Sequence, residues 1–269
     1  MNRFLDVKRE RYLNEMGLGP VWKKRGRALA PEAPPAAPRI EEPPRTAAAP
    51  RPAPRRAAPP RFDPVPGLTG SVKLDLADER AGRILRMDWP ELKAAVKACE
   101  ACSLRKTCTQ TVFGVGDEQA DWLLVGEAPG AEEDARGEPF VGQAGRLLDN
   151  MLAAIGLARG ENVYICNVLK CRPPGNRNPE PFEVEQCSPH LLRQLELIKP
   201  KLILAMGRFA VQTLLGTEAS IASLRGRLHR YQGVPLIVTY HPAYLLRNLP
   251  DNAKAWEDLC FARRAMAAL

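Results

Sequence analysis

The sequence predicts an α/β domain in which helices cover both faces of a parallel sheet, preceded by a disordered N-terminal arm. Two observations lead to this prediction. From about residue 120 onward, short apolar runs of strand length alternate with segments of helical periodicity. Before residue 70, proline, alanine and arginine dominate, and such a segment has too little apolar surface to offset the entropy of ordering.

The N-terminal arm separates into two parts. Apolar residues recur at helical spacing over residues 4–17, so residues 1–27 are interpreted as a short basic amphipathic segment. Thirteen of the 26 prolines lie in residues 31–66, which makes residues 28–70 a Pro/Ala-rich disordered linker. Residues 71–269 form the predicted globular domain.

Charge is also concentrated in the arm. Residues 1–70 carry 14 Lys/Arg against 7 Asp/Glu, whereas the remainder carries 25 against 24. An ill-ordered arm is the simpler interpretation, and a contact with a protein partner or a non-specific contact with DNA is the alternative. If the globular domain binds an anionic polymer, it must therefore do so through a local patch of basic residues.

The sequence disfavours a membrane-spanning or secreted protein. No run approaches the ~20 apolar residues that span a bilayer, and the N-terminus lacks the apolar stretch of a secretory signal. We therefore expect a cytoplasmic protein without a membrane contact. In a reducing compartment, the seven cysteines favour metal ligation over disulfides.

The elements of the domain follow in order. Strands are predicted at 122–125, 163–168, 202–206 and 235–239, and helices at 143–156, 183–198, 208–215 and 252–267. Over 143–156, for example, Leu147, Leu148 and Met151 share one side of the helix. Short apolar strands between helices are typical of a parallel sheet buried on both faces.

Three polar motifs follow strands. The turn Gly126–Gly130, the amide Asn167 and the imidazole His241 each lie at or just after a strand end. Because ligands bind at the carboxyl ends of parallel strands, an active site is expected where these motifs meet. The turn matches neither a P-loop nor a dinucleotide fingerprint, and taken alone it could be purely structural.

Four cysteines indicate a metal or iron–sulfur site. Cys99 and Cys102 form a C-x-x-C pair, whereas Cys171 and Cys187 are separated by 15 residues. Structural zinc sites usually combine two short pairs, but spacing alone leaves zinc and a four-cysteine cluster both open. Cys108 lies close enough to compete as a ligand. Cys166 and Cys260 are expected to be buried small hydrophobes.

Taken together, these motifs resemble the family 4 uracil-DNA glycosylases, the iron–sulfur type, over roughly residues 88–268. The likeness includes the C-x-x-C pair, Gly126–Asp134, Pro139–Gly145, Asn167–Pro174, Cys187 and His241–Arg247. The resemblance implies a three-layer αβα sandwich and a [4Fe-4S] cluster held by Cys99, Cys102, Cys171 and Cys187. It also implies uracil-containing DNA, single- or double-stranded, as the substrate.

The resemblance also implies roles in uracil binding. The base is flipped into a pocket, where Phe140 stacks on it and Asn167 reads its edge, rejecting cytosine. His241 stabilises the charge that develops on uracil O2. Backbone N–H groups of the Gly126–Gly130 turn assist it, at Ala128 and Gly130.

The remaining roles are less specific. Glu127, Glu133 and Asn176 are candidates to orient the attacking water or to balance the sugar cation, and Glu133 could instead shape the pocket against thymine. Leu246 and Arg247 are the candidates for a wedge in the base stack and a phosphate contact. An ordinary helix start has the same composition as that loop.

Two rival functions remain. The first is a non-catalytic iron–sulfur protein that binds DNA in replication or repair. Phe140, Asn167 and His241 together argue against it, because a pure binder would not need all three. The second is a zinc-stabilised nucleotide hydrolase, which the absence of a phosphate-binding lysine motif disfavours.

Overall fold

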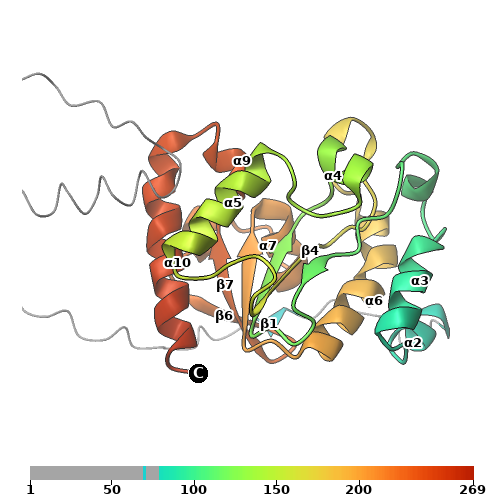
Figure 1. The fold of residues 1–269 in the computed structure, drawn as a ribbon, viewed down its shortest axis with the longest axis horizontal. Coiled ribbons are helices and arrows are strands. Elements are labelled where there is room, and N and C mark those ends of the chain that lie inside the picture. Colours follow the sequence, from blue (N-terminus) through green and yellow to red (C-terminus); the bar gives the residue numbers. More distant parts are fainter. Residues whose placement is uncertain (1–68, 71–78) are drawn as a thin grey trace, which may run out of the picture.

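The computed structural model describes residues 69–70 and 79–269, which form a seven-stranded sheet with helices on both faces (Figure 1). The strand order is β1-β6-β7-β5-β3-β4-β2. The strands are β1 (Thr69–Gly70), β2 (Val115–Gly116), β3 (Trp122–Gly126), β4 (Val163–Asn167), β5 (Leu202–Met206), β6 (Leu228–Tyr231) and β7 (Val234–Thr239). The predicted amphipathic segment 1–27 and residues 28–68 of the predicted linker lie outside the described residues. The last two linker residues form β1, so the sheet begins slightly earlier than expected.

The four predicted strands lie side by side in the order β4-β3-β5-β7, and every neighbouring pair among them is parallel. This confirms the predicted parallel centre of the sheet. At its margins the sheet is mixed, because β2 runs antiparallel to β4 and β6 runs antiparallel to β7. Neither of these strands was predicted: β2 has two residues, and β6 is short and polar.

The predicted helices are confirmed, with boundaries that differ by two residues or fewer. Further short helices surround them. The helices are α2 (Glu79–Ile84), α3 (Trp89–Lys97), α4 (Ala131–Arg136), α5 (Gln143–Ala154), α6 (Pro181–Ile198), α7 (Arg208–Leu215), α8 (Ile221–Leu224), α9 (Pro242–Leu245) and α10 (Asn252–Met266), with 3-10 turns η1 (Ser103–Lys106), η2 (Pro174–Asn176) and η3 (Leu249–Asp251).

Helices cover both faces of the sheet, as the αβα sandwich requires. On one face, α5, α9 and α10 pack against Trp122 and Leu124 of β3. On the other, α6, α7 and α8 pack against Leu123 and Val125 of the same strand. This alternation follows from the two-residue period of a strand, and it explains why β3 is buried along its whole length.

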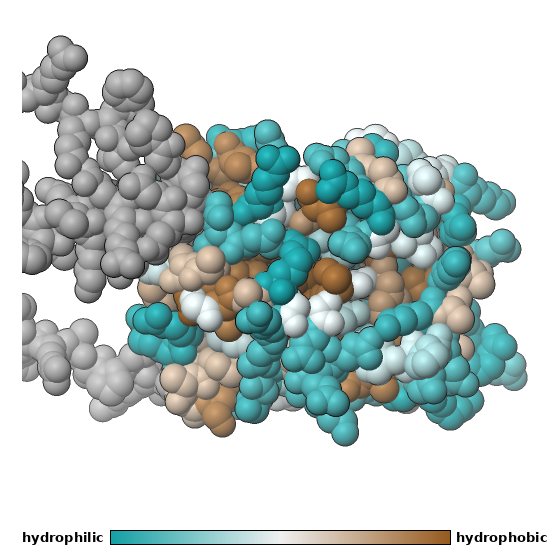
Figure 2. Space-filling view, in the orientation of Figure 1, coloured by the Kyte–Doolittle hydropathy of each residue, from teal (hydrophilic) through white to brown (hydrophobic). Residues whose placement is uncertain are grey.

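The outer surface is mostly polar. Figure 2 shows a largely hydrophilic face with separate hydrophobic residues among the polar ones. Among the described residues, the large hydrophobic side chains that are exposed are Phe182, Leu246, Leu249 and Leu269. None of the described helices is both long enough and apolar enough to cross a membrane.

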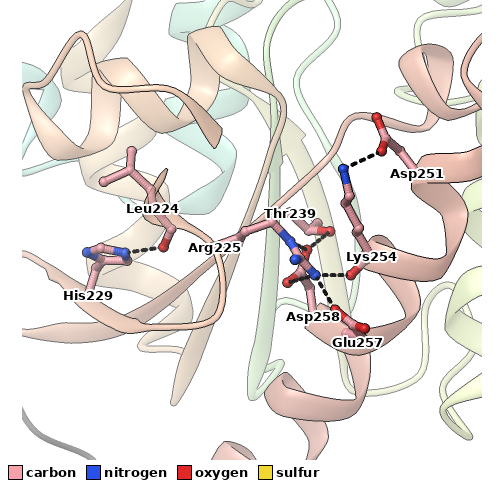
Figure 3. A network of polar contacts seen from close by, with 8 residues as sticks. All are labelled: Leu224, Arg225, His229, Thr239, Asp251, Lys254, Glu257 and Asp258. Atoms are coloured by element: carbon pink, nitrogen blue, oxygen red, sulfur yellow. Dashed lines mark hydrogen bonds and ion pairs between the residues drawn. The ribbon is translucent and has the colours of Figure 1, made fainter. Parts of the chain in front are cut away.

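A buried ion pair fixes α10 against the end of β7 (Figure 3). Asp258 is 1% exposed, and its carboxylate accepts hydrogen bonds from Arg225 Nε at 3.1 Å and from the Thr239 hydroxyl at 3.0 Å. Burial raises the pKa of Asp258 to about 6, although Arg225 opposes the shift. Arg225 also donates to the backbone carbonyl of Lys254 and pairs with exposed Glu257. The network therefore joins α10, the end of β7 and the residue after α8.

We expect Asp258→Ala to lower the free energy of unfolding by about 3 kcal/mol, because it removes the buried carboxylate that pairs with the half-buried Arg225 guanidinium and with the Thr239 hydroxyl. Glu257→Ala is the matched control, since it removes the other carboxylate of Arg225 at a site that is 70% exposed. That variant should lose less than about 1 kcal/mol. Denaturant unfolding of both variants measures the difference, and equal losses would contradict the assignment.

Candidate active site and cysteine pocket

A cleft of about 910 Å³ lies at the carboxyl ends of the central strands. It brings together nine residues that the sequence singled out. They are Glu127, Ala128, Gly130, Glu133, Phe140, Asn167, Asn176, His241 and Arg247. Leu246 does not line the cleft; it lies beside Arg247 and is 38% exposed.

Asn167 ends β4 and is 2% exposed. Its side-chain oxygen Oδ1 is buried and has no hydrogen-bond partner in the described structure. Gly126, which pairs with Asn167 in the sheet, leaves room for this amide, because a Cβ at residue 126 would lie 2.4 Å from Oδ1. A buried acceptor without a partner is costly, so this oxygen is suited to a ligand that donates a hydrogen bond.

Phe140 packs beside Asn167 in an unusual backbone conformation, with φ at 56°. Its ring stacks on the His241 ring with centroids 5.3 Å apart. Arg159 holds this turn, since its guanidinium donates to the carbonyls of Pro139 at 2.9 Å and Phe140 at 2.8 Å and pairs with Asp149. Sequence analysis missed Arg159, because no strand end or motif marks it.

His241 follows β7 and caps α9. Its Nδ1 accepts a hydrogen bond from the backbone N–H of Ala243 at 3.1 Å, so in the neutral ring the proton is on Nε2. Burial lowers the pKa of His241 to about 4, and Arg247 adds to this effect. The imidazole is therefore a neutral hydrogen-bond donor above about pH 5.

Two of the predicted polar candidates, Glu133 and Asn176, already have hydrogen-bond partners within the protein. The Glu133 carboxylate accepts backbone N–H groups from Gly130, Val141 and Gly142 at 3.1, 3.0 and 3.3 Å, so it ties the first turn to the Phe140 loop. Asn176 Oδ1 accepts from Arg172 Nε at 2.7 Å.

Glu127 differs from both, because burial raises its pKa to about 7 and only the nearby charge of Arg208 opposes the shift. Its carboxylate also makes no hydrogen bond within the described residues. It is the acid that the fold leaves available to a ligand.

The cleft also contains Tyr244 of the His241–Arg247 motif, and further residues that sequence analysis did not single out. Tyr240 and Tyr244 stack at 5.3 Å, and the Tyr244 hydroxyl donates to Asp251 at 2.6 Å. Arg208 lines the same cleft directly after the end of β5, as His241 lies after β7. The strand-end rule could have found Arg208, whereas Lys254 lies in the first turn of α10, where no such signal marks it.

A second, smaller pocket is lined by all four predicted ligand cysteines, Cys99, Cys102, Cys171 and Cys187. Its volume is about 20 Å³, against about 910 Å³ for the cleft. Among the described residues, no three His, Cys, Asp or Glu side chains are arranged to hold a single metal ion. Cys108 packs against Cys171 without lining this pocket, and Cys166 is fully buried in the sheet. Cys260 is only partly buried, and no disulfide forms.

The surroundings of these cysteines suit thiolate ligands. Arg80 donates to Cys99 Sγ at 3.5 Å, and the Lys170 backbone N–H donates to Cys187 Sγ at 3.3 Å. Burial raises the pKa of Cys187 to about 11 and that of Cys102 in the same direction, so without a metal these thiols hold their protons. Four sulfur donors around one space, with N–H groups directed at two of them, fit a metal-sulfur centre.

We expect Gly145→Ala to unfold at least about 2 kcal/mol more easily, although alanine is normally favoured within a helix. A Cβ on Gly145 would lie 1.8 Å from the Phe140 carbonyl oxygen, so the Phe140 turn must move. Gly82→Ala is the control, because that helical position has only Arg86 nearby, at 3.9 Å. It should be neutral or slightly stabilising in the same denaturant titration, and similar behaviour of the two variants would refute the close contact.

Comparison with known proteins agrees with this geometry. The model of the uracil DNA glycosylase superfamily matches residues 113–260. The type-4 uracil-DNA glycosylase of Archaeoglobus fulgidus is 51% identical over 159 residues, which cover 56% of this chain and 79% of that protein. The type-4 enzymes of Thermotoga maritima and Pyrobaculum aerophilum are 47% and 43% identical, covering 59% and 64% of this chain and 83% and 92% of their own lengths. The chain therefore belongs to the type-4 uracil-DNA glycosylases of the uracil DNA glycosylase superfamily.

Proposed function

We propose that this protein removes uracil from DNA by hydrolysing the N-glycosidic bond, which leaves an abasic site for base excision repair. Water forms a bond to the sugar C1′ as the bond from C1′ to uracil N1 breaks. The bonding electron pair leaves with uracil, which ends with a proton from water. The observation that carries the proposal is the unpaired, buried Oδ1 of Asn167 beside Phe140 and His241.

Asn167 supports selection of uracil. Its free Oδ1 suits the N3–H donor of uracil, and its side-chain N–H groups suit the O4 acceptor. Cytosine carries an acceptor at N3 and an amino donor at position 4, so both contacts would be reversed. A site that leaves buried polar groups unpaired discriminates strongly against the wrong ligand. Ala128 and Gly130 would contribute backbone N–H groups, and Phe140 a stacking surface.

His241 is suited to stabilise the leaving base. The neutral ring has Nε2–H available, because Nδ1 already accepts from Ala243. Uracil O2 gains negative charge as the glycosidic bond breaks, so the hydrogen bond from a fixed donor to O2 becomes stronger in the transition state. The stacked ring of Phe140 keeps the imidazole in one orientation.

Glu127 is the acid that we assign to the water or the sugar cation. Glu133 is already satisfied by three backbone N–H groups and Asn176 by Arg172, so we give these two a positioning role in place of direct participation. The ionised form of Glu127 could orient water and offset the positive charge that develops on the sugar. That form predominates only above the raised pKa.

The cysteine pocket supports a [4Fe-4S] cluster held by Cys99, Cys102, Cys171 and Cys187. A cluster binds each thiolate through a different iron, so the four sulfurs need only surround a common space. The centre would stabilise the fold by joining the segment before η1 to α6. A cytoplasmic location, where these thiols stay reduced, is part of the same proposal.

The cleft also supports a contact with the DNA backbone. Arg208 and Arg247 line it, and neither forms an ion pair within the described residues. Guanidinium groups without a carboxylate partner are suited to phosphate oxygens. Exposed Leu246 next to Arg247 keeps its proposed role as a wedge, and the basic arm, residues 1–70, is proposed to add non-specific contacts to DNA or a protein partner.

The main alternative is a non-catalytic DNA-binding protein with the same cluster and fold. The neutral, oriented imidazole of His241 and the raised pKa of Glu127 argue against it. Base recognition alone requires neither of these features, and perturbed groups gathered in a cleft are typical of catalysis.

His241→Ala is expected to slow uracil excision by at least about 100-fold, because it removes a fixed donor to the leaving base. Alkali-labile breaks in a uracil-containing oligonucleotide measure excision, with anaerobically purified protein. Glu257→Ala, which lies outside the cleft lining, should excise like the wild type. No breaks from wild-type protein with its metal centre intact would favour the binding-protein alternative.

Excision by the wild type is expected to rise with pH through about 7, because Glu127 must lose its proton to act. Glu127→Gln should be slower and should lose this rise. The His241 pKa near 4 lies too low to produce it. Measuring kcat/KM between pH 5 and 9 tests the assignment, and an unchanged profile in Glu127→Gln would exclude Glu127 as the titrating group.

A further inference from the structure

Lys170 is a buried lysine with an unusual set of partners. Its side chain is 2% exposed, and its Nζ donates to the backbone carbonyl of Asn167 at 2.8 Å and to Gln194 Oε1 at 2.6 Å. Both acceptors are neutral. No carboxylate within the described residues forms an ion pair with this ammonium. A buried charge without an opposite charge is costly, so the partner must be sought elsewhere.

The cysteine pocket is the nearest place where such a partner could form. Lys170 lines it together with the four cysteines, and its own backbone N–H donates to Cys187 Sγ. Thiols lose their protons when they bind iron, so the loaded pocket is anionic. The ammonium then has a counter-charge that the metal-free thiols do not provide.

Lys170 also contacts a residue of the candidate active site. The carbonyl that it holds is that of Asn167, three residues earlier in the chain. Gln194, the second acceptor, is fully buried and is itself fixed by a hydrogen bond from Nε2 to the Phe113 carbonyl at 3.0 Å. The lysine therefore anchors the end of β4 at the residue whose amide faces the cleft.

We propose that Lys170 is a positioning residue through which the anionic cysteine centre holds the uracil-reading amide of Asn167 in place. The inference rests on the proposed function and deepens it. It predicts that the metal centre contributes to base recognition as well as to the fold. Lys170 touches neither the base nor the sugar.

A double-mutant cycle of Lys170→Met and Asn167→Ala tests this under single-turnover conditions. Lys170→Met alone should slow excision by about 10-fold or more, with binding of uracil-containing DNA changed less than about threefold. In the Asn167→Ala background, the same substitution should cost less than about threefold, because the amide that it positions is gone. A purely structural role for Lys170 would give equal losses in both backgrounds, which would overturn the proposal.

The metal centre gives a readout that is independent of excision. Iron and acid-labile sulfide are measured for each variant, together with the reduction potential of the centre. Lys170→Met should lower that potential, since a nearby positive charge stabilises the reduced, more anionic form. Lys170→Arg should keep the wild-type potential and most of the activity, and Lys201→Met, at an exposed ion pair, should change neither.

Lys170→Gln replaces Lys170→Met in the cycle if the methionine variant does not fold, because it removes the charge but keeps a donor. An unchanged potential in the neutral variants would overturn the proposal. Wild-type protein that excises uracil but holds no thiolate-bound metal would overturn it as well. Wild-type protein that holds the centre but excises nothing would instead refute the proposed function, which separates the two failures.

Discussion

The register of the four parallel strands determines where the polar groups at and just after the strand ends lie in the cleft. Gly126 pairs with Asn167 across β3 and β4, and Met206 pairs with Thr239 across β5 and β7. The strands therefore end at one level, and the residues that follow them converge. A Cβ on Gly207 would approach the His241 Cβ to 2.8 Å, just as a Cβ on Gly126 would collide with Asn167. Only glycine, which has no Cβ, leaves room for Asn167 and His241 at these two positions.

Two charged side chains near the cleft, Glu133 and Arg159, hold the backbone of the loops in place through hydrogen bonds. Glu133 lies in the acidic run after the first turn, and its carboxylate joins that turn to Val141 and Gly142. Arg159 holds the carbonyls on the other side of the Phe140 turn. A non-glycine residue at positive φ costs on the order of 1–3 kcal/mol and persists only where its surroundings fix it. These two charged residues supply that fixation for Phe140.

The sequence predicted what depends on local pattern. Buried strands such as β5 are continuous apolar runs, and α5 shows its apolar side at helical spacing, so both were found. The polar residues directly after strands were found for the same reason. Strand β6, which lies between β1 and β7, was missed because its four residues, Leu228–Tyr231, are partly polar and gain their pairing from these neighbours. Arg159 contacts the Phe140 carbonyl 19 residues away and Lys170 contacts Gln194 24 residues away, and no spacing in a single sequence encodes such tertiary contacts.

The long interval between Cys171 and Cys187, which by spacing alone could not decide between zinc and a cluster, has a structural explanation. The chain leaves the cysteine pocket at Cys171 and lines the cleft from Pro173 to Asn178. It then returns through the capping box of Glu180 and Glu183, which starts α6 and so places Cys187. Arg177 and Glu183 form an ion pair across this excursion, with Glu183 lining the cysteine pocket and Arg177 lining the cleft. With only two residues between Cys171 and Cys187, the chain could not reach the cleft and return. The longer interval is needed because one continuous segment contributes residues to both sites.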